Sequence, residues 1–207
     1  NQQGVTMSSI DTTANKRALY GKFYRDWVRY GGTPNRSAVA RMIGEFKRTD
    51  GSAPVTASCQ KNFGMLFTDG FSNSPDDNDG ISGVYANVDG SYGNPYSDDY
   101  SGSLADAVMS AYVNPLRTGT NFPRGKVSVS NRCPAAGTSY SGPLDCNRDL
   151  HMNFFAVTLN TRGLQFNVDG VQQDPYVTKP LWPTNFPPRH PSAVDDLWHG
   201  TVNGPSV

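Results

Sequence analysis

Two short polar segments of this chain carry residues that could bind a divalent metal ion. The first is Gly-Gly-Thr-Pro at 31–34, which places the hydroxyl of Thr33 at the start of a helical pattern. The second is Thr-Asp-Gly at 68–70, where Asp69 follows a short apolar run. Open α/β sheets bind ligands at the carboxyl ends of their strands, and hard cations prefer oxygen ligands, so we expect Thr33 and Asp69 to converge on one site. The simpler alternative is that Thr33 caps a helix and Asp69 caps a turn.

The elements that would position these residues are helices and strands in alternation. Apolar residues recur at helical spacing in residues 17–30, 33–46 and 104–113, and strand-like runs occupy 62–68 and 152–159. This order predicts an α/β fold in which a parallel sheet has helices on both faces. Two strands are too few for a stable sheet of this kind. We therefore expect its first strands to lie further upstream, with part of a third strand near the amino end of the chain.

The helix starts carry recognisable capping signals. Thr33 is a natural N-cap with Pro34 at the first helical position, and Ser103 is expected to cap the helix at 104–113. Ser192 and Asp195 form a capping-box pattern that predicts a last short helix around Leu197.

The composition limits the class of protein. At 207 residues the chain fits one domain with large insertions. Its 18 Lys and Arg balance 18 Asp and Glu, so no net field favours nucleic acid or an anionic membrane, and we expect neither as a partner. No apolar stretch approaches the roughly 20 residues that span a bilayer. The chain opens with Asn1 and not Met, which is typical of a processed or excised piece.

The cysteines suggest a disulfide and no zinc site. Cys133 and Cys146 flank a Gly/Ser/Pro-rich loop that has no apolar periodicity of its own. A bond between them would close a loop of about 14 residues and stabilise the fold by roughly 3 kcal/mol. It would also place the protein in an oxidising compartment. Two free thiols are the alternative, and Cys59 is left over in either case.

An Asp/Gly-rich insertion is expected at residues 72–102, where aliphatic side chains are scarce. Its spacing of Asp76, Asn78 and Gly80 departs from that of an EF-hand loop, and no late Glu follows. The insertion as a whole is expected to be extended and structured. For its segment 76–89, weak Ca²⁺ binding is one interpretation, but a solvated loop is the preferred one. The insertion contains six aspartates: Asp76, Asp77, Asp79, Asp89, Asp98 and Asp99.

Signals for catalysis are few, so we expect a protein that is not an enzyme. The chain has no nucleophile elbow, P-loop, zinc-protease motif or dinucleotide fingerprint. His151 opens a strand and is expected to be a satisfied core or rim histidine. His199 is expected to pair with backbone carbonyls and not with a metal. The acidic insertion could imitate the two carboxylates of a glycosidase, which leaves a secreted carbohydrate-active enzyme as a remote alternative.

The two polar segments resemble a metal-ion-dependent adhesion site of the von Willebrand factor A domain. Gly32-Thr33-Pro34 resembles the second of the three loops of that site, and Thr68-Asp69-Gly70 resembles the third. The first loop, Asp-x-Ser-x-Ser, has no counterpart in this chain. The resemblance implies Mg²⁺ or Mn²⁺ at an incomplete site, with Thr33 and Asp69 as ligands.

Further segments resemble the PilY/PilC family, the large proteins associated with the tips of bacterial type IV pili. The most specific is Asp-Asp-Leu-Trp-His at 195–199, and the signals occur in family order from residue 31 to 204. The others are the segments 59–63, 87–90, 103–107, 151–152 and 202–204. Members have a von Willebrand A-like domain followed by a β-propeller, so the resemblance implies that residues 1–207 are the carboxyl-terminal part of the former. The family's propeller calcium loop has no counterpart here.

The resemblance implies a cell-surface module for adhesion and pilus assembly that acts by binding. Its partners would be minor pilins or other pilus tip proteins and a host or abiotic surface ligand. It would be exported through the periplasm to the cell surface or pilus tip, which agrees with a disulfide loop at 133–146. The alternative from another class is a calcium-stabilised structural spacer with no ligand of its own.

Overall fold

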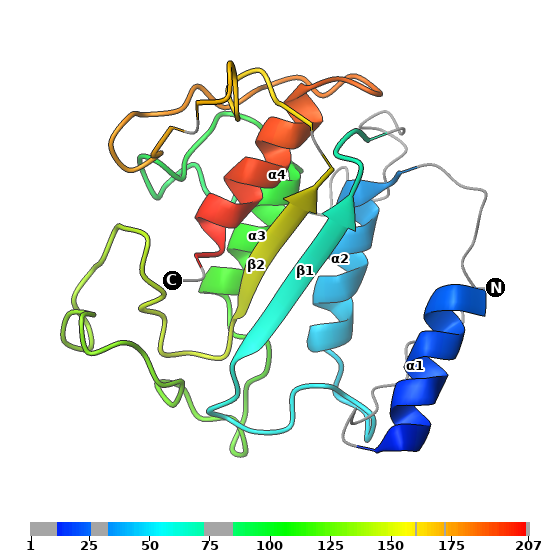
Figure 1. The fold of residues 1–207 in the computed structure, drawn as a ribbon. Coiled ribbons are helices and arrows are strands. Elements are labelled where there is room, and N and C mark those ends of the chain that lie inside the picture. The colour runs from blue at the N-terminus through cyan, green and yellow to red at the C-terminus, as the bar shows by residue number, and fades with distance from the viewer. Residues whose placement is uncertain (1–11, 26–32, 73–84, 160, 172, 206–207) are drawn as a thin grey trace.

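A computed structural model describes residues 12–25, 33–72, 85–159, 161–171 and 173–205 of the chain (Figure 1). It is a mixed α/β fold in which a two-stranded parallel sheet packs against helices, as the alternation of sequence patterns predicts. The elements in chain order are α1 (Thr13–Arg25), α2 (Asn35–Phe46), β1 (Asn62–Thr68), α3 (Leu104–Val113), β2 (Met152–Thr158) and α4 (Ser192–Asn203). None of the described helices is long and apolar enough to cross a membrane.

The two strands run side by side, and their inner face carries the core. β1 and β2 pair in parallel from Asn62 opposite Met152 to Thr68 opposite Thr158. Helices α2, α3 and α4 form one layer against this sheet (Figure 1). Gly64 faces that layer opposite the fully buried Phe154, and its missing side chain leaves room for Met42. The buried core cluster comprises Val39, Ile43, Val55, Leu104, Ala107, Val108, Ala111, Leu116, Val127, Leu150, Met152, Phe154 and Leu197.

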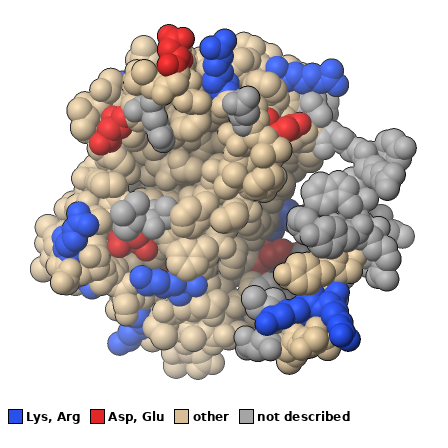
Figure 2. Space-filling view, in the orientation of Figure 1, with Lys and Arg blue, Asp and Glu red and all other residues tan. Residues whose placement is uncertain are grey.

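The outer face of the sheet is open. Because side chains alternate along a strand, Phe63, Met65 and Phe67 point away from the helical layer, and they are 54%, 64% and 63% exposed. Figure 2 shows the face turned toward the viewer with its charged side chains at the periphery and few in its centre. The expectation of helices on both faces is thus wrong for the described residues, whose helices α2, α3 and α4 cover one face.

The first helix stands apart from this core. α1 begins at Thr13, earlier than the predicted start at residue 17, and Leu19 and Tyr20 on it are exposed. The predicted continuation through residues 26–30 lies outside the described residues, as do residues 3–9 of the expected third strand.

The helix starts agree with the sequence at α3 and differ at α2 and α4. Ser103 caps α3, with its hydroxyl accepting from the backbone N–H of Asp106 at 2.9 Å, and the Asp106 carboxylate completes a capping box. α2 begins at Asn35, so Pro34 and not Thr33 occupies the N-cap position. The capping box predicted from Ser192 is also wrong, because Ser192 already lies within α4.

Candidate functional site

The carboxyl end of β1 and the amino end of α2 meet at one edge of the sheet. The Thr68 hydroxyl lies 3.1 Å from the side-chain oxygen of Asn35, to which it can donate. The hydroxyl of Ser72 donates to the Thr33 carbonyl oxygen at 3.1 Å. These hydrogen bonds hold the Thr33 loop beside the loop that carries Asp69, as the expected placement requires. That Thr33 and Asp69 bind a metal ion stays a prediction.

The chemistry offered at this edge is oxygen-rich and solvent-facing. Asp69 is exposed, while Thr68 is buried and its hydroxyl accepts from the backbone N–H of Gly70 at 3.2 Å. Gly70 has φ +100°, a left-handed conformation that favours glycine and turns the chain sharply after the strand. The side-chain amide nitrogen of Asn35 is buried here without a hydrogen-bond partner. The hydroxyl and carboxylate oxygens at this edge suit a hard cation, with water supplying most of the coordination, whereas the Asn35 N–H group is a donor and not a ligand.

The segment Asp-Asp-Leu-Trp-His at the middle of α4 binds three different parts of the chain. The first carboxylate, Asp195, accepts hydrogen bonds from the backbone N–H groups of Leu164, Gln165 and Phe166 at 2.7, 3.1 and 2.9 Å. Burial raises the pKa of Asp195, although these hydrogen bonds oppose the shift. Asp195 therefore fixes the loop after β2 and does not cap its own helix.

The second carboxylate, Asp196, connects three helices. It accepts from the guanidinium Nε of Arg36 on α2 at 2.9 Å, and both side chains are buried. It also accepts from the first two backbone N–H groups of α3, those of Leu104 at 3.2 Å and Ala105 at 3.3 Å. A carboxylate at a helix amino end is favoured by the helix dipole, so the charge of Asp196 stabilises the start of α3.

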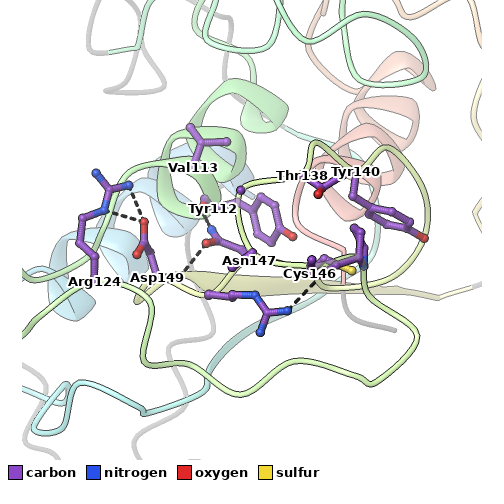
Figure 3. Close-up of a pocket in the computed structure, with 13 residues that line it drawn as sticks. Tyr112, Val113, Arg124, Thr138, Tyr140, Cys146, Asn147 and Asp149 are labelled. Carbon is purple, nitrogen blue, oxygen red and sulfur yellow. Dashed lines mark hydrogen bonds and ion pairs between the residues drawn. The ribbon is translucent and has the colours of Figure 1, made fainter.

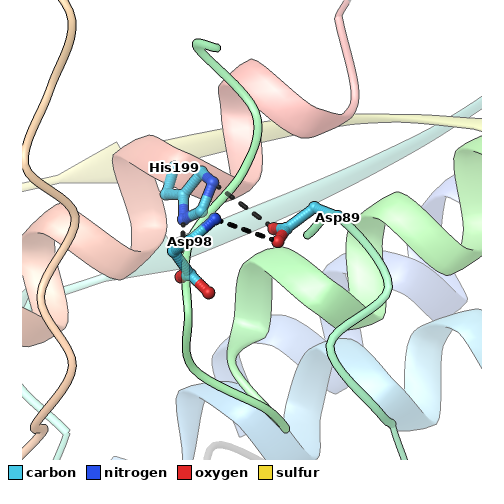
Figure 4. A group of neighbouring side chains, drawn as sticks. All are labelled: Asp89, Asp98 and His199. Atoms are coloured by element: carbon cyan, nitrogen blue, oxygen red, sulfur yellow. Dashed lines mark hydrogen bonds and ion pairs between the residues drawn. The ribbon is translucent and has the colours of Figure 1, made fainter. Parts of the chain in front are cut away.

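The histidine of the same segment enters a buried cluster with two aspartates of the insertion (Figure 4). His199 Nε2 lies 3.4 Å from Asp89 Oδ2, and His199 Nδ1 lies 3.4 Å from Asp98 Oδ2. The carbonyl oxygen of Tyr96 is 2.5 Å from Nε2, and the imidazole stacks on Trp182 with ring centroids 4.0 Å apart. One ligand atom from each of the three side chains lies within 4.8 Å of the others, so the group could hold a metal ion.

Burial dominates the electrostatics of this cluster. It raises the pKa of Asp89 to about 7; the charge of His199 opposes that shift, and the carboxylates of Asp98 and Asp106 add to it. Asp89 also accepts from the side-chain amide of Asn203 at 2.6 Å. The preferred interpretation of residues 76–89 as a solvated loop is therefore wrong for Asp89, whose side chain is 0% exposed. The Asp98 side chain, further along the insertion, is 3% exposed. Asp76, Asp77 and Asp79 lie outside the described residues.

The cluster went unpredicted because its members are far apart in sequence. Asp89 and Asp98 belong to the insertion, whereas His199 follows about a hundred residues later on α4. The sequence features that could have indicated the cluster are two aspartates in a segment poor in aliphatic residues and one histidine in a specific motif. The expectation that His199 pairs with a backbone carbonyl is confirmed by Tyr96, and its two carboxylate neighbours are new.

The disulfide loop forms a separate hollow on the surface (Figure 3). Cys133 is bonded to Cys146, as predicted, and Cys59 is free and exposed. The hollow, about 360 Å³, lies between the loop and Tyr112. On its rim Arg124 forms an ion pair with Asp149, and Arg148 donates to the Pro134 carbonyl oxygen at 3.2 Å. These charged groups are already engaged with protein partners and hold the loop in place.

His151 anchors the same loop from inside. Its Nδ1 lies 2.6 Å from the Asp149 carbonyl oxygen and its Nε2 lies 3.1 Å from the Asp145 carboxylate. The ring is buried, so the expectation of a satisfied core histidine is confirmed.

Comparisons with protein-family models, with curated proteins and with solved structures found no match to this chain.

Proposed function

We propose that this chain is a von Willebrand A-like module of the PilY/PilC family, which acts at the tips of type IV pili by binding a protein or a surface. The observation that carries the proposal is the meeting of the Thr33 and Asp69 loops at the carboxyl end of β1. In a von Willebrand A domain the second and third loops of the adhesion site meet at the same edge. No catalytic constellation enters this proposal.

The buried role of the Asp-Asp-Leu-Trp-His segment supports the family assignment. Asp195 and Asp196 each hold a different part of the fold. Leu197 lies in the buried core cluster, and Trp198 packs against Trp182 with ring centroids 4.9 Å apart. A segment in which every residue has a separate structural task tolerates few substitutions, so it is specific as a family marker. The Cys133–Cys146 disulfide supports export, because such bonds persist in oxidising compartments.

Metal titration tests the proposed edge site. We expect the chain to bind Mn²⁺ weakly, because Thr33 and Asp69 supply two protein ligands and octahedral ions need six. Asp69→Ala should abolish this binding and leave the far-UV circular dichroism unchanged, since Asp69 is exposed. The matched control is Asp99→Ala, an exposed aspartate of the insertion. Calorimetric titration that gives equal Mn²⁺ affinity for wild type and Asp69→Ala would reject the site.

A binding assay separates the adhesion module from the structural spacer. Immobilised minor pilins and abiotic surfaces are the probes, each in the presence and absence of Mn²⁺. Retention that depends on Mn²⁺ and on Asp69 supports the module. Thermal stabilisation by Ca²⁺ without retention on any probe supports the spacer, and release of reducing sugar from polysaccharide supports the enzyme.

A further inference from the structure

The cluster of Asp89, Asp98 and His199 holds more negative charge than its neighbours compensate. Two carboxylates face one imidazole, and within the described part of the chain neither forms an ion pair with Lys or Arg. Asp106 adds a third carboxylate nearby, although its own oxygens accept from Ser103 and from the backbone N–H of Val88. Because an uncompensated buried charge is costly, the site favours an additional cation.

Two buried oxygen atoms at this cluster lack donors. Asp98 Oδ2 has no hydrogen-bond partner although its side chain is 3% exposed, and it is directed toward the imidazole. The side-chain oxygen of Asn203 is also unpartnered and fully buried, on the amide group that touches Asp89. Buried acceptors in native proteins are nearly always satisfied. A metal ion satisfies acceptors without supplying a donor.

We propose that Asp89, Asp98 and His199 bind one divalent transition-metal ion, with Zn²⁺ preferred over Ca²⁺ and Mg²⁺. An imidazole nitrogen beside carboxylate oxygens suits Zn²⁺, whereas Ca²⁺ and Mg²⁺ favour oxygen ligands alone. At Zn–ligand distances near 2.0–2.2 Å, two ligand atoms of a tetrahedral ion lie about 3.3 Å apart. The 3.4 Å separation of His199 Nδ1 from Asp98 Oδ2 already has this spacing.

The ion binds Nδ1 of His199, and Nε2 donates to the carbonyl oxygen of Tyr96 at 2.5 Å, which orients the ring. Such outer partners fix the tautomer of metal-bound histidines. The stacking on Trp182 holds the imidazole plane in place. The metal ties the insertion, through Asp89 and Asp98, to α4. The site is structural, because its members are buried, and it differs in ligand chemistry from the oxygen-only edge at Asp69.

Zinc titration of the metal-free 207-residue chain tests the proposal. We expect one Zn²⁺ per chain, and we expect Asp98→Asn and His199→Gln each to lower the affinity by about tenfold or more. His190→Gln is the matched control, since His190 bonds Ser192 and lies outside the cluster, and Asp69→Ala should leave Zn²⁺ affinity unchanged. The result for Asp69→Ala makes failure of this site distinguishable from failure of the edge site.

Three results would overturn the proposal. One is a wild-type chain that binds no Zn²⁺ in calorimetry, and another is equal affinity in wild type and His199→Gln. If circular dichroism shows that both cluster variants fail to fold, X-ray absorption of the Zn²⁺-loaded wild type decides. Scattering from one imidazole nitrogen with carboxylate oxygens supports the site, and its absence refutes it.

Discussion

Arg36 and Asp196 form a buried ion pair across 160 residues of sequence, with Nε and Oδ2 2.9 Å apart. Arg36 lies on α2 beside the Thr33 loop, and Asp196 lies on α4 about two turns before that helix ends at Asn203. The Arg36 guanidinium also lies over the Phe186 ring, 4.1 Å from its centroid. Through this pair, the helix that starts at the proposed edge site is fixed to the Asp-Asp-Leu-Trp-His segment.

Removing the arginine of this pair should be strongly destabilising. Arg36→Met leaves the Asp196 carboxylate buried without its cation, which costs about 3–5 kcal/mol when one partner of a buried pair is lost. Arg124→Met is the matched control: its ion pair with Asp149 is on the surface, and such pairs are worth about 0–1 kcal/mol. Urea unfolding of both variants measures the difference. Equal losses would show that the Arg36 charge is not buried in solution.

Two helical glycines should respond to alanine in opposite directions. Gly44 on α2 has no atom within 4 Å of an added Cβ, so Gly44→Ala should stabilise the chain by up to about 1 kcal/mol through helix propensity. Gly200 on α4 is buried, and a Cβ there would lie 2.5 Å from Cδ2 of Leu104, itself buried. Gly200→Ala should therefore destabilise by roughly 1–3 kcal/mol. Thermal unfolding of the two variants in parallel checks the signs, and a stabilised Gly200→Ala would contradict the close approach of α3 and α4.

The anchor of the disulfide loop should weaken in acid. Burial alone would raise the pKa of Asp145, but the hydrogen bond and charge of His151, together with hydrogen bonds from Asn153 and the backbone of Asn147, outweigh it and hold that pKa below its ordinary value. A depressed carboxyl pKa contributes stability above the unfolded pKa of about 3.9, and this contribution is lost as the pH falls through the folded value. Urea midpoints at pH 6 and pH 3 should therefore differ less in Asp145→Asn than in wild type. The same difference in both proteins would refute this linkage.

Local patterns predicted the elements well, and long-range relations less well. The strands, the Ser103 cap and the Cys133–Cys146 bond follow from alternation, capping chemistry and a loop without a core. Asp195 shows the limit: its position after Ser192 fits a capping box, yet its carboxylate binds the backbone of residues 164–166. The sequence around Asp195 does not predict this partner, because the contact depends on the path of the loop after β2. His199 meets Asp89 for the same kind of reason.

The open face of the sheet yields the last prediction. Parallel sheets are normally covered on both faces, yet Phe67 of β1 is 63% exposed and lies opposite the exposed Val157 of β2. If that face is open in solution, Phe67→Thr should change stability by less than about 0.5 kcal/mol, whereas Phe154→Ala on the inner face should cost about 3–5 kcal/mol.

Phe67→Thr should also reduce the binding of an apolar dye such as anilinonaphthalene sulfonate, which reports exposed hydrophobic surface. Threonine suits a strand, so the backbone pairing is retained. A loss of stability in Phe67→Thr that approaches that of Phe154→Ala would mean that the outer face is covered in solution, and Phe67 would then belong to a second core.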